Sequence, residues 1–332
     1  MPLENNSYNL DMTRSSSPDL QTSSPAEHPL DVLRSLSDWQ KAGQNSALAI
    51  LTDTQGGAVR ARGAVMAICE DGRASGYLSG GCVDADIIQH GKNAIRSGVP
   101  ASLLYGKGSP FMDITLPCGG AIEVTIVPNI PPETIKAVVE RLEHRSAASL
   151  QLTTPAMDIN VQYTPKLRLR IAGRNADPLA LARIAIASGI ETELWSNDGD
   201  CLGSASNIAE LTTIALGTPS SLPDTQDDAC TAFVLMMHDP DWEMPLLKQS
   251  LLGQAFYIGA VGSPRTHQMR CARLLEAGVP ASSIERIHGP IGLVPSLRNA
   301  STLGVSTLAE IIAEFDEAHP VLSISLKEQT HV

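Results

Sequence analysis

Apolar residues in the first half of the chain form short runs separated by turn residues, and their spacing changes between that of strands and that of helices. Two segments, Cys82–Ser97 and Pro131–Ala147, carry apolar residues at helical spacing. Glycine pairs and Asp71-Gly72 mark hairpin turns between the other runs. The runs of strand length are Ala47–Asp53, Ala64–Glu70, Ser75–Leu78, Phe111–Leu116 and Ala121–Val127. The pattern predicts an α+β domain over residues 29–147.

In the second half, apolar strands alternate with helical segments. Ala232–Met237 is continuously apolar, which is typical of a parallel sheet covered on both faces. The helix expected at Pro264–Ala277 has Ser263 as its N-cap and Gly278 as its stop. The same alternation predicts strands at Leu167–Ala172, Glu191–Trp195 and Ala255–Ala260 and helices at Pro178–Ser188 and Thr307–Ala318. It predicts an α/β protein with a Rossmann-like doubly wound parallel sheet over residues 166–320.

The remaining parts of the chain have a different composition. Residues 1–28 are rich in Ser and Pro and are expected to form a disordered tail. Residues 148–165 are expected to be a linker with one or two extended pieces, and residues 321–332 a C-terminal tail. A length of 332 residues suits two domains. Neither a signal peptide nor an apolar run of membrane-spanning length is visible, which predicts a cytoplasmic protein that makes no membrane contact.

Charge and cysteine content narrow the function. The chain has 24 Lys and Arg against 36 Asp and Glu, a formal net charge of −12. An acidic chain without a basic run is a poor binder of nucleic acid, so an anionic ligand must be held locally by N–H groups and a few arginines. The 6 cysteines form no CxxC pair. This disfavours a structural zinc site and favours reduced thiols.

Two cysteines stand beside paired glycines. Ser79-Gly80-Gly81-Cys82 lies where a strand is expected to meet a helix, so that the first N–H groups of the helix would point at a ligand. The helix dipole would give the thiol thiolate character, but Asp84 and Asp86 in the first turn oppose it, so only modest activation is expected. Pro117-Cys118-Gly119-Gly120 is expected at a turn between two strands. A thiolate suits a soft metal, or a cofactor that carries sulfur on a metal. A buried cysteine in a tight turn explains either motif alone equally well.

The second half offers one candidate anion site and one candidate crevice. Gly259, Gly262, Ser263 and Arg265 form a glycine-rich strand-to-helix turn that suits a phosphate group; a capped tight turn is the structural alternative. His238 and Asp239 follow an apolar strand and either line the same crevice or form a hydrogen-bonded pair.

The first turn of the second half lacks the dinucleotide fingerprint. A single glycine, Gly173, follows the strand at Leu167–Ala172, and Arg174 and Asn175 stand where a pyrophosphate needs bare backbone. Ordinary NAD binding is therefore disfavoured, and a Rossmann-like scaffold is favoured.

Taken together, these motifs resemble the xanthine dehydrogenase accessory protein family of the XdhC/CoxI type, over residues 45–315. The pairing of SGGCV with a later LPCGG is specific to that family. The motifs that carry the resemblance are Arg62-Gly63-Ala64-Val65-Met66, Ser79-Gly80-Gly81-Cys82-Val83, Leu116-Pro117-Cys118-Gly119-Gly120, His238-Asp239-Pro240 and Tyr257-Ile258-Gly259-Ala260-Val261-Gly262-Ser263.

The resemblance implies a non-catalytic, homodimeric chaperone of the molybdenum cofactor. It would bind molybdopterin or a dinucleotide form transiently, support its sulfuration by a cysteine desulfurase, and deliver it to an apo-molybdoenzyme of the xanthine dehydrogenase or aldehyde oxidoreductase class. Cys82 and Cys118 would lie near the molybdenum, and the Gly259–Arg265 turn would hold the phosphate. The candidate cofactor-binding residues are Ser79, Gly80, Gly81, Cys82, Cys118, Gly119, Gly120, His238, Gly259, Gly262, Ser263 and Arg265.

Two other functions remain open at this point. An NAD(P)-dependent oxidoreductase would bind its cofactor in the Rossmann-like half. In a protein–protein adaptor, the turns at Gly80-Gly81-Cys82 and Cys118-Gly119-Gly120 (the two glycine corners) would be structural and would bind no cofactor.

Overall fold

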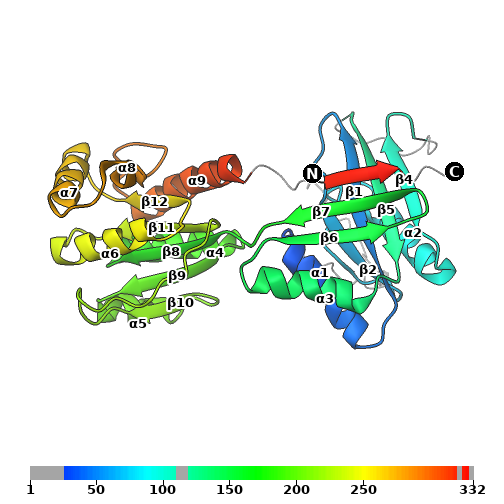
Figure 1. The fold of residues 1–332 in the computed structure, drawn as a ribbon, viewed down its shortest axis with the longest axis horizontal. Helices are drawn as coiled ribbons and strands as arrows, with labels where there is room; N and C mark the ends of the chain where they lie inside the picture. Colours follow the sequence, from blue (N-terminus) through cyan, green and yellow to red (C-terminus); the bar gives the residue numbers. More distant parts are fainter. Residues whose placement is uncertain (1–25, 110–118, 320–323, 329–332) are drawn as a thin grey trace, which may run out of the picture.

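The computed structural model describes residues 26–109, 119–319 and 324–328. Two domains lie side by side along the long axis of the molecule (Figure 1). The predicted strand at Phe111–Leu116 lies outside the described residues.

The N-terminal domain is built on a five-stranded antiparallel sheet in the order β3-β2-β1-β5-β4. Helices α1 and α3 cover one face of the sheet and α2 covers the other. Alternate residues of β1 serve the two cores: Leu48 and Ile50 face α1 and α3, whereas Ala47 and Ala49 face α2. The elements are α1 (Pro29–Lys41), β1 (Ser46–Gln55), β2 (Val65–Cys69), β3 (Ala74–Ser75), α2 (Asp84–Ser97), β4 (Ala101–Gly106), β5 (Ala121–Pro128) and α3 (Pro132–Glu143).

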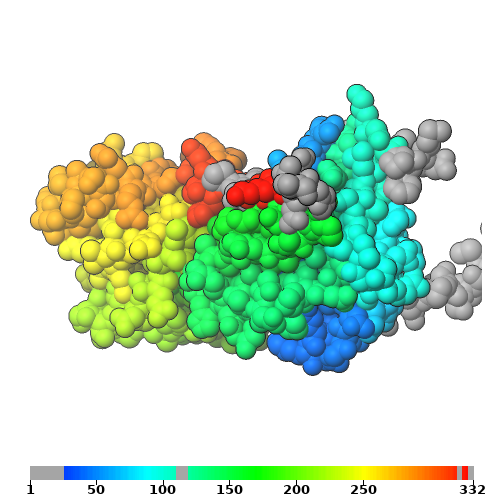
Figure 2. Space-filling view, turned by 45° about the vertical axis from the view of Figure 1, so that its right-hand side comes forward, coloured from blue at the N-terminus to red at the C-terminus, as the bar shows by residue number. Residues whose placement is uncertain are grey.

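The segment expected to be a linker is instead a folded part of the N-terminal domain. Within residues 148–165 the chain forms a hairpin of β6 (Ala148–Thr153) and β7 (Met157–Tyr163). The expected C-terminal tail contributes β14 (Ile324–Glu328), which pairs antiparallel with β7. Figure 2 shows β14, in red, against the green hairpin. The hairpin folds because every second residue is apolar: Leu150 and Val161 are completely buried in the core shared with α1 and α3.

The second domain is a parallel sheet in the order β10-β9-β8-β11-β12-β13, which confirms the predicted doubly wound fold. The strand order reverses direction between β8 and β11, which is the switch point of such sheets. The strands are β8 (Arg168–Gly173), β9 (Glu191–Ser196), β10 (Thr212–Ala215), β11 (Thr231–Met236), β12 (Tyr257–Ala260) and β13 (Ile287–His288). The helices are α4 (Ala176–Ala187), α5 (Gly199–Ala205), α6 (Pro240–Leu252), α7 (Pro264–Glu276), α8 (Ala281–Ile284) and α9 (Ala300–Ala318).

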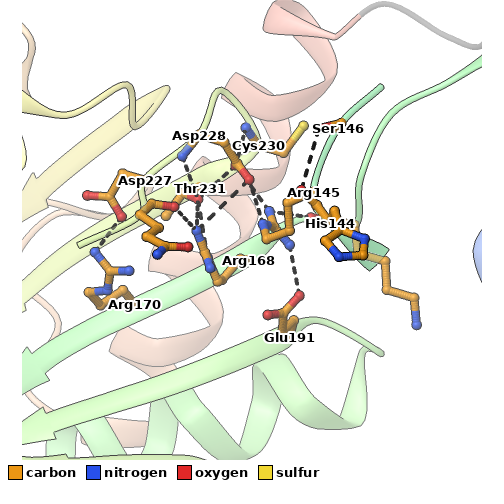
Figure 3. A network of polar contacts seen from close by, with 12 residues as sticks. His144, Arg145, Ser146, Arg168, Arg170, Glu191, Asp227, Asp228, Cys230 and Thr231 are labelled. Carbon is orange, nitrogen blue, oxygen red and sulfur yellow. Dashed lines mark hydrogen bonds and ion pairs between the residues drawn. The ribbon is translucent and has the colours of Figure 1, made fainter. Parts of the chain in front are cut away.

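A polar network joins the two domains at the amino end of the parallel sheet (Figure 3). Arg145, two residues after α3, donates to Asp228 Oδ2 at 2.5 Å and to Glu191 Oε2 at 2.8 Å. It also donates to the Lys166 carbonyl at 3.0 Å. Arg168, which opens β8, lies behind it with its Nη2 atom 3.9 Å from Asp228 Oδ2. The end of α3 is thereby held against the starts of β8 and β9.

Candidate functional site

The first glycine–cysteine motif forms the loop between β3 and α2. Helix α2 begins at Asp84, two residues later than Cys82. The Asp84 carboxylate accepts hydrogen bonds from the N–H groups of Leu78 at 3.0 Å, Ser79 at 3.0 Å and Gly81 at 2.7 Å. Three backbone N–H groups of the loop that leads into α2 are therefore bound by the chain itself and do not face a ligand.

The other residues of this loop either hold its backbone in place or remain accessible to a ligand. The Ser79 side chain is buried, and its hydroxyl accepts a hydrogen bond from the Val83 N–H at 2.9 Å. Gly80 and Gly81 have φ angles of 70° and 105°, which favour glycine. Cys82 is exposed, with a free thiol. The loop thus presents a thiol to solvent on a backbone fixed by Asp84.

The second motif approaches the first through a shared loop. Cys118 lies outside the described residues, whereas Gly119 and Gly120 are described. A Cβ on Gly120 would lie 2.6 Å from the Gln55 carbonyl oxygen and 2.8 Å from that of Gly57, so only glycine fits between them. The same β1–β2 loop carries Val59, whose Cγ1 is 3.4 Å from an ideal Cβ on Gly80. The structure therefore brings Gly80 of the first motif and Gly120 of the second against the same loop, residues 56–64.

The second-half candidates lie at the carboxyl edge of the parallel sheet. Ser263 caps α7 by accepting the Thr266 N–H at 3.1 Å. Arg265 and His238 are exposed. Gly262 has a φ of 142°, which favours glycine. Gly259 is required by packing, because a Cβ there would lie 2.6 Å from Tyr257 Cε1. At this edge of the sheet, the groups that could bind an anion are thus Arg265 and the capped N-terminus of α7.

The switch point is closed by an ion pair. Arg174, which follows β8, donates to Asn197 Oδ1 and to Asp239 Oδ2, both at 2.6 Å. Asn175 takes φ 67° and ψ −146°, a conformation normally adopted by glycine. The guanidinium and its partners span the switch point between β8 and β11, over which a dinucleotide pyrophosphate would lie. The geometry therefore disfavours the NAD(P) alternative.

The two groups of candidates lie in different domains, and the second group lies at the end of the second domain that faces away from the first. Leu167 and Ile190, which precede β8 and β9, line a cleft against the N-terminal domain. The strands run away from that domain, so their carboxyl ends lie at the far end of the molecule (Figure 1). Within one chain, the Cys82 loop and the Gly259–Arg265 turn are consequently not part of one site.

The interdomain cleft itself is a feature that the sequence analysis missed. It has a volume of about 890 Å³ and is lined by the start of α1, by Arg60 and Lys166, and by the ends of α4 and α9. No sequence pattern marks it, because its walls come from segments separated by up to several hundred residues. Among the described residues there is no group of three or more His, Cys, Asp or Glu that could hold a metal ion. None of the helices in the described ranges is both long enough and apolar enough to span a membrane.

Comparison with known proteins gives consistent results over both domains. Residues 39–106 match the XdhC and CoxI family, and residues 169–311 match the XdhC Rossmann domain. The chain is 33% identical over 296 residues to the molybdenum cofactor insertion chaperone PaoD of Escherichia coli (strain K12), covering 84% of this chain and 86% of that protein. A crystal structure described as a xanthine dehydrogenase from Bacillus halodurans has a TM-score of 0.70 and 19% identity, covering 88% of this chain and 97% of the other. At that identity the likeness shows the fold alone.

Fold and site together define a two-domain protein in which a Rossmann domain without the dinucleotide fingerprint follows an antiparallel-sheet domain with an exposed, glycine-flanked thiol. The chain belongs to the XdhC and CoxI family, as the motif order predicted.

Proposed function

We propose that this protein is a molybdenum cofactor insertion chaperone. It binds the cofactor transiently, protects it, supports its sulfuration by a cysteine desulfurase, and inserts it into an apo-molybdoenzyme of the xanthine dehydrogenase or aldehyde oxidoreductase class. It acts as a maturation factor rather than a catalyst, and as a homodimer. The observation that carries the proposal is the 33% identity to a molybdenum cofactor insertion chaperone along 84% of the chain.

The geometry of the Cys82 loop supports this function. An exposed thiol on a backbone fixed by Asp84 suits reversible contact with a metal that carries sulfur ligands. No hydrogen bond joins Cys82 to a histidine or lysine within residues 26–109, 119–319 and 324–328, whereas a nucleophilic catalyst needs an adjacent base. Cys82 is therefore suited to contact the cargo without forming a covalent intermediate.

Co-purification tests the proposal directly. The full-length protein is isolated from cells that make molybdenum cofactor, and the bound pterin is measured by its fluorescence after oxidation. We expect pterin with the wild-type protein and a clear loss with Cys82→Ala. The matched control is Cys271→Ala, which removes a partly exposed thiol from α7 in the other domain and leaves pterin binding unchanged.

Two results would contradict these assignments separately. Wild-type protein that carries no pterin from cofactor-producing cells would overturn the chaperone function. Equal pterin in wild-type and Cys82→Ala proteins would leave the function standing and remove Cys82 from the site. Mass spectrometry of the co-purified proteins identifies the client and the desulfurase.

A further inference from the structure

If the protein carries a pterin phosphate, the described part of the Cys82 loop does not supply the anion site for it. The N–H groups of Leu78, Ser79 and Gly81 already donate to Asp84, and a second carboxylate, Asp86, follows in the first turn of α2. The anion that these N–H groups hold is thus the chain's own Asp84, which leaves none of the three for a phosphate. The phosphate must therefore be bound by another part of the chain.

We propose that the cleft between the two domains binds the pterin phosphate, with Arg60 as the phosphate ligand. This inference rests on the proposed function and names the binding site for its cargo. The cleft volume of about 890 Å³ is in the range of small-molecule sites, which occur preferentially at domain interfaces. It differs from the Gly259–Arg265 turn, which lies at the other end of the parallel sheet.

The cleft and the Cys82 loop share a wall. Arg60 lines the cleft, and its guanidinium carbon lies 4.8 Å from the centre of the Tyr77 ring, two residues before Ser79. The preceding residue, Val59, contacts Gly80. Tyr77 also donates to Glu27 Oε1 at 2.8 Å, and Glu27 lines the cleft. A ligand in the cleft would therefore lie beside the loop that presents the Cys82 thiol.

Arg60 is the cation in the cleft whose charge is available. Its guanidinium donates to the Glu27 carbonyl, and among the residues that the structure describes it forms no ion pair. Lys166, the other nearby cation, is paired with Asp31 at 2.7 Å. A guanidinium held by a carbonyl and an aromatic ring keeps N–H groups free for a forked contact with phosphate oxygens.

The part of the cleft lining that comes from the end of α9 suits a flat heteroaromatic ring. Phe315 and His319, at the end of α9, line the cleft with their rings stacked at 4.5 Å between centres. Aromatic side chains bind planar rings by stacking. Glu27 and Asp31 supply carboxylate oxygens that can accept hydrogen bonds from the amino and ring N–H groups of a pterin. A pterin whose phosphate reaches Arg60 therefore matches the rings and the hydrogen-bonding groups of the cleft.

Binding of two fluorescent probes by the purified full-length protein tests the site. Neopterin monophosphate carries the phosphate, and neopterin differs by lacking it. We expect tighter binding of the monophosphate by the wild type. Arg60→Gln should weaken monophosphate binding by about tenfold, as for the loss of one charged hydrogen-bonding group, and leave neopterin binding unchanged. Arg265→Gln tests the competing site at the Gly259–Arg265 turn. Arg273→Gln, which changes another exposed arginine of α7, is the matched control and should change neither.

The outcomes separate this inference from the function. Weaker binding of the monophosphate by Arg265→Gln, with Arg60→Gln like the wild type, would place the phosphate at the Gly259–Arg265 turn and overturn the inference. A wild type that binds neither probe yet co-purifies with cofactor would overturn the cleft site and leave the chaperone function standing. If Arg60→Gln does not fold, Arg60→Lys replaces it, because lysine keeps the positive charge but loses the forked contact of the guanidinium with phosphate oxygens. The same selective loss of monophosphate binding is then expected, and unchanged binding would overturn the inference.

Discussion

Two glycine-rich turns that lead into helices look alike in the sequence but differ in how their polar groups are used. In the Cys82 loop, Asp84 binds three N–H groups of its own chain, and what remains available is a thiol. In the turn after β12, the cap is a neutral hydroxyl, that of Ser263, and what remains exposed is Arg265. A glycine pattern therefore predicts the path of the backbone, whereas the acid or hydroxyl that follows it decides whether the turn can hold an anion.

The largest expected effect tests the role of Asp84. Asp84→Ala removes the acceptor for the N–H groups of Leu78, Ser79 and Gly81, of which the first two belong to buried residues. We expect a loss of about 2–3 kcal/mol in the free energy of unfolding, because buried donors left unpaired each cost about 1–3 kcal/mol and part of the loop can rehydrate. Urea unfolding at neutral pH measures it.

The matching change in the other turn is Arg265→Gln. Its side chain is exposed, so the free energy of unfolding should change by less than about 0.5 kcal/mol. Asp84→Asn retains one acceptor oxygen and should fall between the two. If Asp84→Ala unfolds at the same urea concentration as the wild type, the carboxylate does not hold the loop and the contrast between the turns fails.

The N-terminus of a third helix, α1, is capped by a side chain that can gain a proton, that of His28. His28 accepts the Leu30 N–H on Nδ1 at 3.2 Å, which requires the neutral ring. Burial, assisted by the positive charge of Lys166, lowers the pKa of His28 from 6.5 to about 4. Between these values the unfolded chain binds a proton that the folded chain does not, so stability is lost as pH falls from about 6.5 toward 4. The expected loss is up to about 3 kcal/mol, at about 1.4 kcal/mol per pH unit.

His28→Asn isolates this contribution. Asparagine is a good N-cap and has no proton to gain in this range, so the variant should lose less stability than the wild type on acidification. Urea unfolding of both proteins at pH 7, 6 and 5 gives the difference, in which the carboxylates common to both proteins cancel. Parallel pH curves for the two proteins would show that His28 is not the titrating cap.

Local patterns along the chain predicted the doubly wound sheet and both glycine corners. Residues 148–165 are predicted as a linker with one or two extended pieces, and these pieces are the strands β6 and β7. Buried residues alternate within each strand, but the third strand of their sheet, β14, begins only at residue 324, so no local pattern indicates the sheet. The sequence analysis assigns no element to residues 240–252, which form helix α6; Pro245 lies inside this helix, where proline normally ends one.

The candidate site was predicted less completely than the fold. The motif indicated Cys82 as a candidate. The hydrogen bonds from the loop backbone to Asp84 depend on the path of the chain, which Gly80 and Gly81 allow but do not determine. The cleft beside Arg60 is assembled only when α9 returns to the N-terminal domain, which no local pattern records.

The smallest expected effect concerns the neutral cap of the second turn. Ser263→Ala removes the acceptor of the Thr266 N–H and a hydroxyl contact with Thr266 Oγ1 at 2.9 Å. A loss of about 1 kcal/mol is expected, and Ser263→Gly should lose only a few tenths, because water reaches the exposed cap of a glycine variant more easily. Both are measured by urea unfolding beside Asp84→Ala. If Ser263→Ala were as destabilising as Asp84→Ala, the hydroxyl would organise its turn as fully as the carboxylate does. The two turns would then differ only in the side chain that they expose.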